Sequence, residues 1–182
     1  MLPLKDCYVT SPYGVVRSNN KVHTGIDLIS KSGDREVRAI KGGIYCGKFW
    51  DAYGYGNYCV VENYDKIRTL YCHLKSVEEI QNGAEIDEGQ LLGIEGTTGN
   101  STGIHLHLEI REDPYTGKFH KNIADYLGIK NEKGYVTMKE MTREEAKKIV
   151  QEKTGFEDST MQFLDSYIWR DDLFKKLVNA MT

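Results

Sequence analysis

Ile104-His-Leu-His-Leu-Glu-Ile110 alternates apolar and polar side chains without interruption. Successive side chains of a β-strand point to opposite faces of a sheet, so this run predicts a strand with one apolar and one polar face. The apolar set, expected in the core, is Ile104, Leu106, Leu108 and Ile110. The polar set is His105, His107 and Glu109. The strand is therefore predicted to hold two imidazoles on a rigid support.

The rest of the first 112 residues also has β character. Short apolar or alternating runs are separated by turns rich in Gly and Asn, which predicts a mainly β domain. The predicted strands are Ile44–Phe49, Tyr58–Asn63, Arg68–Leu74, Leu91–Glu95 and His105–Arg111, and a short helix is predicted at Asn122–Leu127. We place this domain at residues 1–130.

The pattern changes to a helical one near Lys139. Thr142-Arg-Glu-Glu145 fits a capping box that opens a helix running to about Lys153, and Gly155 suits its end. Amphipathic spacing predicts two more helices, one carrying Met161, Leu164, Ile168 and Trp169 and one carrying Leu173, Phe174, Leu177 and Val178. Residues 139–182 are thus predicted to form a small helical domain. Because so small a unit has a marginal core, docking on a partner or self-association is expected.

Composition excludes several classes of function. The 182 residues carry a net charge of −3 with 40% hydrophobic and 28% charged residues, which gives no electrostatic basis for nucleic-acid binding. No apolar stretch reaches the roughly 18 residues that a membrane helix needs. The first residues lack the basic region and apolar core of a secretory signal, so we expect synthesis in the cytoplasm without a signal peptide.

The four cysteines are Cys7, Cys46, Cys59 and Cys72. None belongs to a C-x-x-C pair, which argues against a thiolate zinc site. Their neighbours are apolar and strand-like, so we expect small buried side chains with free thiols.

Histidine usage carries the functional signal. Four of the five histidines fall in His23-Thr-Gly-Ile-Asp27, Leu70-Tyr-Cys-His73 and the strand around His105 and His107. Imidazole and carboxylate ligands suit zinc, and three protein ligands with an open position are typical of catalytic sites. The sequence therefore predicts a zinc hydrolase. His120 lies outside these motifs and is predicted to be a surface residue.

The backbone around His23 is open to two interpretations. A spacing of four residues puts His23 and Asp27 on one side of a helix, but Gly25 and the run Ile26–Ile29 favour a turn that leads into a strand. Either backbone brings the two side chains to one side.

Alternation also places His73. In Leu70-Tyr-Cys-His-Leu74, it predicts that Tyr71 and His73 share one face and that Cys72 lies on the other. His73 should then lie on the functional face. A thiol peptidase built on Cys72 and His73 is disfavoured, because adjacent residues of a strand point apart.

A specific resemblance now emerges along residues 8 to 112. The segments that carry it, in order, are Thr10-Ser-Pro-Tyr-Gly14, His23-Thr-Gly-Ile-Asp-Leu28, Tyr55-Gly-Asn-Tyr-Cys-Val-Val61, Leu70-Tyr-Cys-His-Leu74, Gly89-Gln-Leu-Leu-Gly93 and Gly99-Asn-Ser-Thr-Gly-Ile-His-Leu-His-Leu-Glu-Ile110. The chain resembles the lysostaphin-type (LytM-like) zinc endopeptidases, which cut peptide bonds in bacterial peptidoglycan. The resemblance implies a mostly antiparallel β-fold with a groove whose floor carries the metal.

The resemblance also implies the roles of individual residues. It implies one Zn²⁺ held by His23, Asp27 and His107, with His73 and His105 as the catalytic pair. The partners would be peptidoglycan peptides, cut in their cross-links or stems. The alternative is a non-catalytic LytM-like module that binds the wall or activates another hydrolase. Residues 139–182 would bind the wall, self-associate or brace the catalytic domain. A wall-digesting enzyme without a secretion signal also resembles a phage lysin, released by or carried on the virion.

Overall fold

The computed structural model describes residues 1–17, 20–112, 119–137 and 143–160. The chain divides into two compact units, Met1–Met138 and Lys139–Thr182. The first unit carries all of the histidines and every strand of the described residues, and its fold is mainly β.

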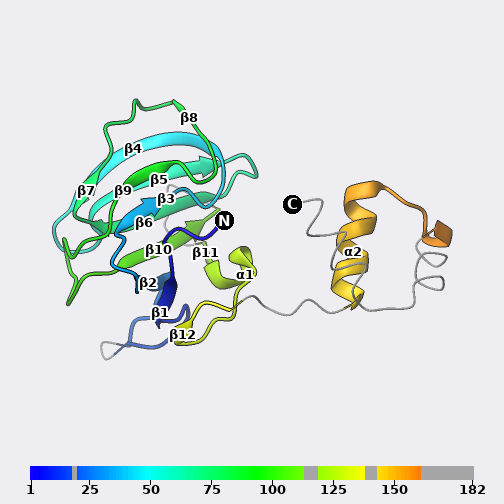
Figure 1. The fold of residues 1–182 in the computed structure, drawn as a ribbon, viewed down its shortest axis with the longest axis horizontal. Coiled ribbons are helices and arrows are strands. Elements are labelled where there is room, and N and C mark those ends of the chain that lie inside the picture. Colours follow the sequence, from blue (N-terminus) through cyan, green and yellow to red (C-terminus); the bar gives the residue numbers. More distant parts are fainter. Residues whose placement is uncertain (18–19, 113–118, 138–142, 161–182) are drawn as a thin grey trace. The chain divides into compact units, whose positions relative to one another are not determined.

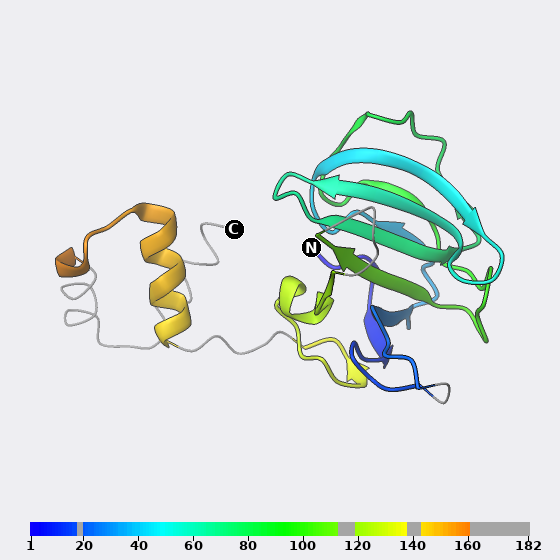
Figure 2. The same cartoon turned by 180° about the vertical axis from the view of Figure 1, so that it is seen from behind.

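Most strands of the first unit belong to one sheet. They are β1 (Cys7–Ser11), β2 (Ile26–Ser30), β4 (Gly43–Asp51), β5 (Gly56–Asn63), β6 (Arg68–Leu74), β8 (Glu85–Ile86), β10 (Leu106–Arg111), β11 (His120–Lys121) and β12 (Gly134–Tyr135). The order is β12-β1-β2-β10-β6-β5-β4-β8, and β11 pairs with β10 beside this path. Neighbouring strands are antiparallel, as the resemblance implies. Both views show the long strands side by side (Figures 1 and 2).

A smaller sheet and a short helix complete the first unit. The sheet has the order β3-β9-β7, formed by β3 (Glu36–Arg38), β9 (Leu91–Ile94) and β7 (Ser76–Val77). Helix α1 (Ile123–Leu127) starts where the Asn122 side chain accepts a hydrogen bond from the Ala124 amide, and it ends at Gly128. The main core joins residues of both sheets and α1, including Val37, Leu92, Leu108, Tyr71 and Ile123.

The two faces of β10 differ as its alternation predicts. Leu106, Leu108 and Ile110 are buried in the main core. His107 and Glu109 are also buried, but they lie on the other face, where His107 is paired with Asp27 of β2 and with Cys72 of β6. Ile104 was expected in the core, and that expectation is wrong: its side chain is 49% exposed because the strand begins only at Leu106.

The prediction for β6 reached the right position for His73 by a wrong argument. Tyr71 belongs to the main core, where its hydroxyl accepts a hydrogen bond from the Ile40 amide (2.9 Å). Strict alternation would therefore send His73 into the core as well. Instead, the pairs Cys59↔Tyr71 and Asn57↔Leu74 enclose one extra residue on β6, a β-bulge. His73 has the left-handed φ of 63°, so its side chain leaves the core face.

Helix α2 (Arg143–Thr154) is the main described element of the second unit. The Gly155 amide donates to the Gln151 carbonyl, and Gly155 has φ 67°, so the helix ends where the sequence predicts. Residues 158–160 are helical. Thr142 of the predicted capping box, and the helices predicted beyond residue 160, lie outside the described residues. Self-association through this unit stays a prediction.

None of the helices in the described part of the chain has the length and apolar character that crossing a membrane requires.

Candidate metal centre

Three of the predicted site residues meet on the face of the large sheet opposite the main core. His23 lies in the segment before β2, Asp27 lies on β2 and His107 lies on the neighbouring strand β10. One ligand atom from each residue lies within 4.8 Å of those of the other two. All three residues are buried, with 3%, 6% and 6% of their surfaces exposed.

The three ligand atoms form a small triangle. Asp27 Oδ1 is 3.0 Å from His23 Nε2 and 2.8 Å from His107 Nδ1, and the two nitrogens are 3.1 Å apart. Zinc bonds of about 2.0–2.2 Å in a tetrahedron place ligand atoms roughly 3.3–3.5 Å apart. Two imidazoles and one carboxylate, with atoms at nearly this spacing, are a donor set that fits zinc.

Electrostatics favours a cation at the centre of this triangle. Burial by itself would raise the pKa of Asp27, but the close approach of the His107 and His23 imidazoles to Oδ1 holds it well below its usual range. Asp27 is therefore ionised at neutral pH. Its second oxygen, Oδ2, accepts a hydrogen bond from Arg17 Nη2 at 2.9 Å, which leaves Oδ1 facing the two imidazoles.

Gly25 allows the His23 segment to cross β10 closely. A Cβ atom at this position would lie 2.4 Å from the Leu108 carbonyl oxygen and 2.7 Å from the His107 ring. No side chain fits, so the glycine between His23 and Asp27 is required by the close approach of two backbones. The segment is a turn that enters β2 at Ile26, not a helix.

Each imidazole of the site is oriented by a partner at its other nitrogen. His23 Nδ1 lies 2.8 Å from the Pro12 carbonyl oxygen, His73 Nδ1 lies 2.8 Å from that of Thr98, and His105 Nδ1 lies 2.8 Å from that of Gly103. A carbonyl only accepts, so each Nδ1 donates its proton and each Nε2 carries a lone pair. His23 therefore directs a free lone pair at the triangle.

His107 is oriented differently, by a carboxylate. Its Nδ1 faces the triangle, and its Nε2 lies 3.2 Å from Glu109 Oε2. Burial would raise the pKa of Glu109, but hydrogen bonds from His107 and Arg111 outweigh it and lower the pKa to about 2. Glu109 is therefore an ionised acceptor at neutral pH.

His73 and His105 lie beside the triangle. Their ring centroids are 4.7 Å apart, and His105 Nε2 is 3.7 Å from Asp27 Oδ1. Burial, together with the neighbouring His105 and His107, lowers the pKa of His73 to about 4. His73 is therefore neutral at pH 7, with Nε2 available as a proton acceptor. The structure thus brings all five predicted site residues together.

A cleft of about 310 Å³ opens over this group. Its lining comes from Arg17, Lys21, Val22, His23, Thr24, Gly54, Tyr55, His73, Asn100 and His107. The predicted groove therefore corresponds to an open hollow above the triangle, with residues 54–55 and Asn100 contributing to its walls.

The cysteines fit the prediction with one exception. All four are free, and Cys7, Cys59 and Cys72 are buried, whereas Cys46 is half-buried. Burial raises the pKa of Cys72 well above its ordinary value, so it does not supply a thiolate. The bulge removes the alternation argument against a Cys72–His73 pair, and burial replaces it as the reason to reject a thiol peptidase.

The structure adds residues that sequence reasoning did not assign. Arg17 contacts Asp27, and Glu109 contacts His107; of the two, only Glu109 carried a signal, since alternation placed it on the same face. The predicted surface position of His120 is only partly right. It is half-buried on β11, and its Nδ1 lies 3.0 Å from the Tyr13 hydroxyl.

Known proteins with similar sequences include bacterial peptidases. The chain is 34% identical over 113 residues to the DD-carboxypeptidase/endopeptidase Mpg of Neisseria meningitidis, covering 60% of this chain and 25% of that protein. It is 35% identical over 118 residues to the glycyl-glycine endopeptidase ALE-1 of Staphylococcus capitis, covering 64% of this chain and 30% of the relative. The chain thus spans only a quarter to a third of the length of these relatives.

A solved structure shows the same fold. The catalytic domain of lysostaphin from Staphylococcus simulans superposes with a TM-score of 0.55 at 29% identity, covering 66% of this chain and 89% of that one. The sequence profile of Peptidase family M23 matches residues 21–125, which include all five site residues. This chain belongs to peptidase family M23.

Proposed function

We propose that this chain is a zinc-dependent endopeptidase that hydrolyses peptide bonds in bacterial peptidoglycan. The observation that carries the proposal is the triangle of His23 Nε2, Asp27 Oδ1 and His107 Nδ1 with two further imidazoles beside it. Membership of family M23, and relatives named as peptidoglycan or glycyl-glycine endopeptidases, support a peptide substrate from the cell wall.

His23, Asp27 and His107 are the residues that would hold the metal. Zinc bound there supplies Lewis-acid polarisation of the scissile carbonyl and of the attacking water. Arg17 keeps Asp27 oriented through Oδ2 while Oδ1 faces the metal position. The burial of all three ligands strengthens their electrostatic interaction with a cation.

His73 and His105 would move the protons of the reaction. Each holds its Nδ1 proton on a backbone carbonyl, so each reacts through Nε2. One Nε2 accepts a proton from the attacking water, and a protonated Nε2 donates to the carbonyl oxygen or to the leaving amine. Because both rings are anchored to backbone atoms, their Nε2 atoms keep the same direction through the cycle.

The test is release of new primary amines from purified peptidoglycan by the zinc-loaded protein. The matched control is the same protein after chelation. Amines that appear only with zinc are the expected result, and sequencing the new termini would identify the bond, since relatives are named for both glycyl-glycine and DD bonds. No amines from several wall types, despite bound zinc, would overturn the proposal in favour of a non-catalytic wall-binding or activating module.

A further inference from the structure

Glu109 is a fully buried carboxylate that the proposed reaction does not use. Its side chain is 0% exposed. Four donors surround it: the Thr24 hydroxyl at 2.7 Å, the Tyr55 hydroxyl at 3.0 Å and His107 Nε2 at 3.2 Å contact Oε2, and Arg111 Nε donates to Oε1. Desolvating a carboxylate is unfavourable unless its lone pairs are satisfied, as they are here. Four directed hydrogen bonds therefore hold the Glu109 carboxylate in one position.

We propose that Glu109 is a positioning residue for the metal site, which holds His107 with its proton on Nε2 and its lone pair on Nδ1. This inference rests on the proposed zinc function. Glu109 already accepts on both oxygens, from the Thr24 and Tyr55 hydroxyls at Oε2 and from Arg111 Nε at Oε1, so the His107 nitrogen that faces it must be a further donor. The other nitrogen, 2.8 Å from Asp27 Oδ1, is then the one free to bind a cation.

The other three histidines of the site show why a side chain is needed at this place. His23, His73 and His105 direct Nδ1 at backbone carbonyls, while hydroxyls of Ser11 and Ser101 lie farther from His23 and His105, at 3.2 and 3.3 Å. His107 lies in the middle of the sheet, paired on both sides with β2 and β6. The neighbouring carbonyls there serve the β-ladder, so the orientation of His107 depends on one side chain.

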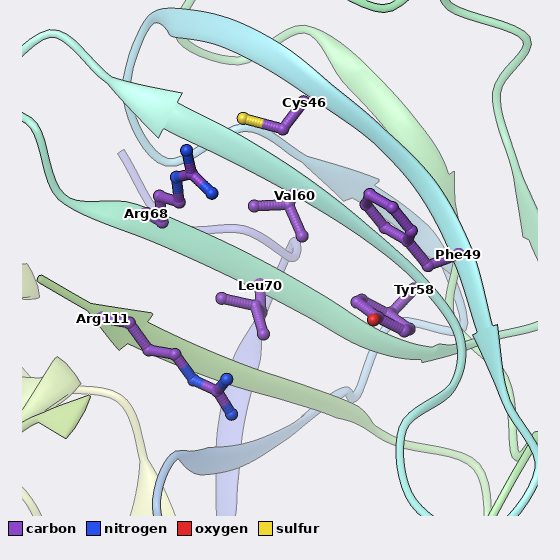
Figure 3. A pocket seen from close by; sticks show the side chains of 7 residues that line it. All are labelled: Cys46, Phe49, Tyr58, Val60, Arg68, Leu70 and Arg111. Carbon is purple, nitrogen blue, oxygen red and sulfur yellow. The ribbon is translucent and has the colours of Figure 1, made fainter. Parts of the chain in front are cut away.

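The hydrogen-bond partners of Glu109 come from segments on both sides of strand β10. Thr24 follows His23 directly, so its hydrogen bond to Glu109 ties the first histidine segment to the same carboxylate. On the other side, Arg111 also donates to the Tyr55 hydroxyl. Figure 3 shows Arg111 reaching over the sheet face at the border of a hollow of about 240 Å³ that Leu70 and Tyr58 also line. Glu109 thus links the segment of His23 and the strand of His107 to the Arg111 side chain.

The first test measures zinc affinity of Glu109→Gln by competition with a chromogenic chelator. Outer carboxylates that orient a ligating histidine typically contribute 10- to 100-fold in metal affinity, so we expect the dissociation constant to rise by about that factor. A glutamine can turn its amide toward His107 and donate to Nε2, which favours the wrong tautomer. Unchanged affinity in this variant would overturn the inference.

The matched control is Glu95→Gln. Glu95 has a side chain that is also 0% exposed and also paired with an arginine, Arg35, at 2.7 Å, but it contacts none of the three ligands. We expect its zinc affinity to stay within about twofold of the parent, as for independent sites. Thermal unfolding of both metal-free variants shows whether each remains folded. Equal loss of affinity in both variants would mean a general effect of removing a buried charge and would also overturn the inference.

A second measurement needs no variant. Nitrogen-15 spectra of the zinc-loaded parent report which ring nitrogen of His107 carries the proton. We expect a slowly exchanging proton on Nε2 and none on Nδ1. A proton on Nδ1 would refute the role of Glu109. A parent chain that binds no zinc at all would instead refute the proposed function, so the two failures are distinguishable.

Discussion

The two faces of β10 are built on different physical principles. On one face Leu106, Leu108 and Ile110 pack into the core through apolar contacts, which depend on volume more than on direction. On the other face His107 and Glu109 are equally buried, but each is held by hydrogen bonds to particular atoms. We therefore expect the first face to control stability and the second to control metal binding, although both faces belong to the same six-residue strand.

Removing a ligand should break the site face completely. We expect Asp27→Ala and His107→Ala to lose zinc at stoichiometric concentrations, because two donors remain where three converge. Peptidoglycan hydrolysis should fall to the background of the assay, while circular dichroism shows a folded β-protein. Zinc content after dialysis is the direct measurement. Asp65→Ala is the control, since this exposed carboxylate pairs with Lys41 away from the triangle. Retained zinc in His107→Ala would contradict the ligand assignment.

Removing an acid–base group should leave the metal in place. His73→Ala and His105→Ala are expected to reduce kcat by about 10²–10⁴, the usual contribution of a general acid or base. Zinc content should stay normal, because both imidazoles lie next to the three metal-binding residues and are not among them. Steady-state kinetics on a defined wall peptide measures this loss. His120→Ala is the histidine control, because its partner is Tyr13. Near-normal turnover in both site variants would show that neither imidazole transfers a proton.

Much of this comparison could be predicted from sequence, because β10 keeps an uninterrupted period of two. The two faces of its residues Leu106 to Ile110 follow from alternation alone. The length of the strand does not: Ile104 continues the pattern but lies before the first ladder residue and is exposed. The strands β3, β7, β8, β11 and β12 have two or three residues each, too few for any period to be read.

His73 illustrates a second limit. A left-handed φ at a histidine inside a strand has no signal in the sequence, because residues other than glycine rarely adopt it. The correct face was therefore reached from an alternation that the bulge interrupts. Arg17 and Glu109 show the same limit for the site, since hydrogen bonds between segments that are far apart in sequence depend on the folded sheet.

Shortening a core-face side chain should affect stability alone. We expect Ile110→Ala to lower the free energy of unfolding by about 2–5 kcal/mol, as for large-to-small changes in cores. Zinc affinity and kcat per folded molecule should not change, because Ile110 points away from the triangle. Denaturant unfolding of the metal-free protein gives the first quantity. Ile104→Ala, at an exposed position, is the control and should change stability little; a large loss of zinc affinity in Ile110→Ala would show that the faces are coupled.

The smallest expected effect concerns the thiols. Burial raises the pKa of Cys59 to about 12 and that of Cys72 well above its ordinary value, so neither should react with iodoacetamide in the native protein at pH 8. Cys46 is half-buried at the border of the hollow in Figure 3 and should be the first cysteine of the sheet to be alkylated. Mass spectrometry locates the label. Hydrolysis should be unchanged after labelling, and rapid labelling of Cys72 would contradict its burial.

The separation of the ligands along the chain has a consequence for the order of folding. Asp27 and His107 are adjacent across two strands but 80 residues apart in sequence. Closing so long a loop is entropically unfavourable, so the β2–β10 pair cannot form early by local contacts. A nascent chain that ends between Asp27 and His107 has only two of the three residues that would bind the metal. Zinc should therefore be acquired after the sheet has assembled, and metal uptake during refolding would be a late kinetic signal of the completed fold.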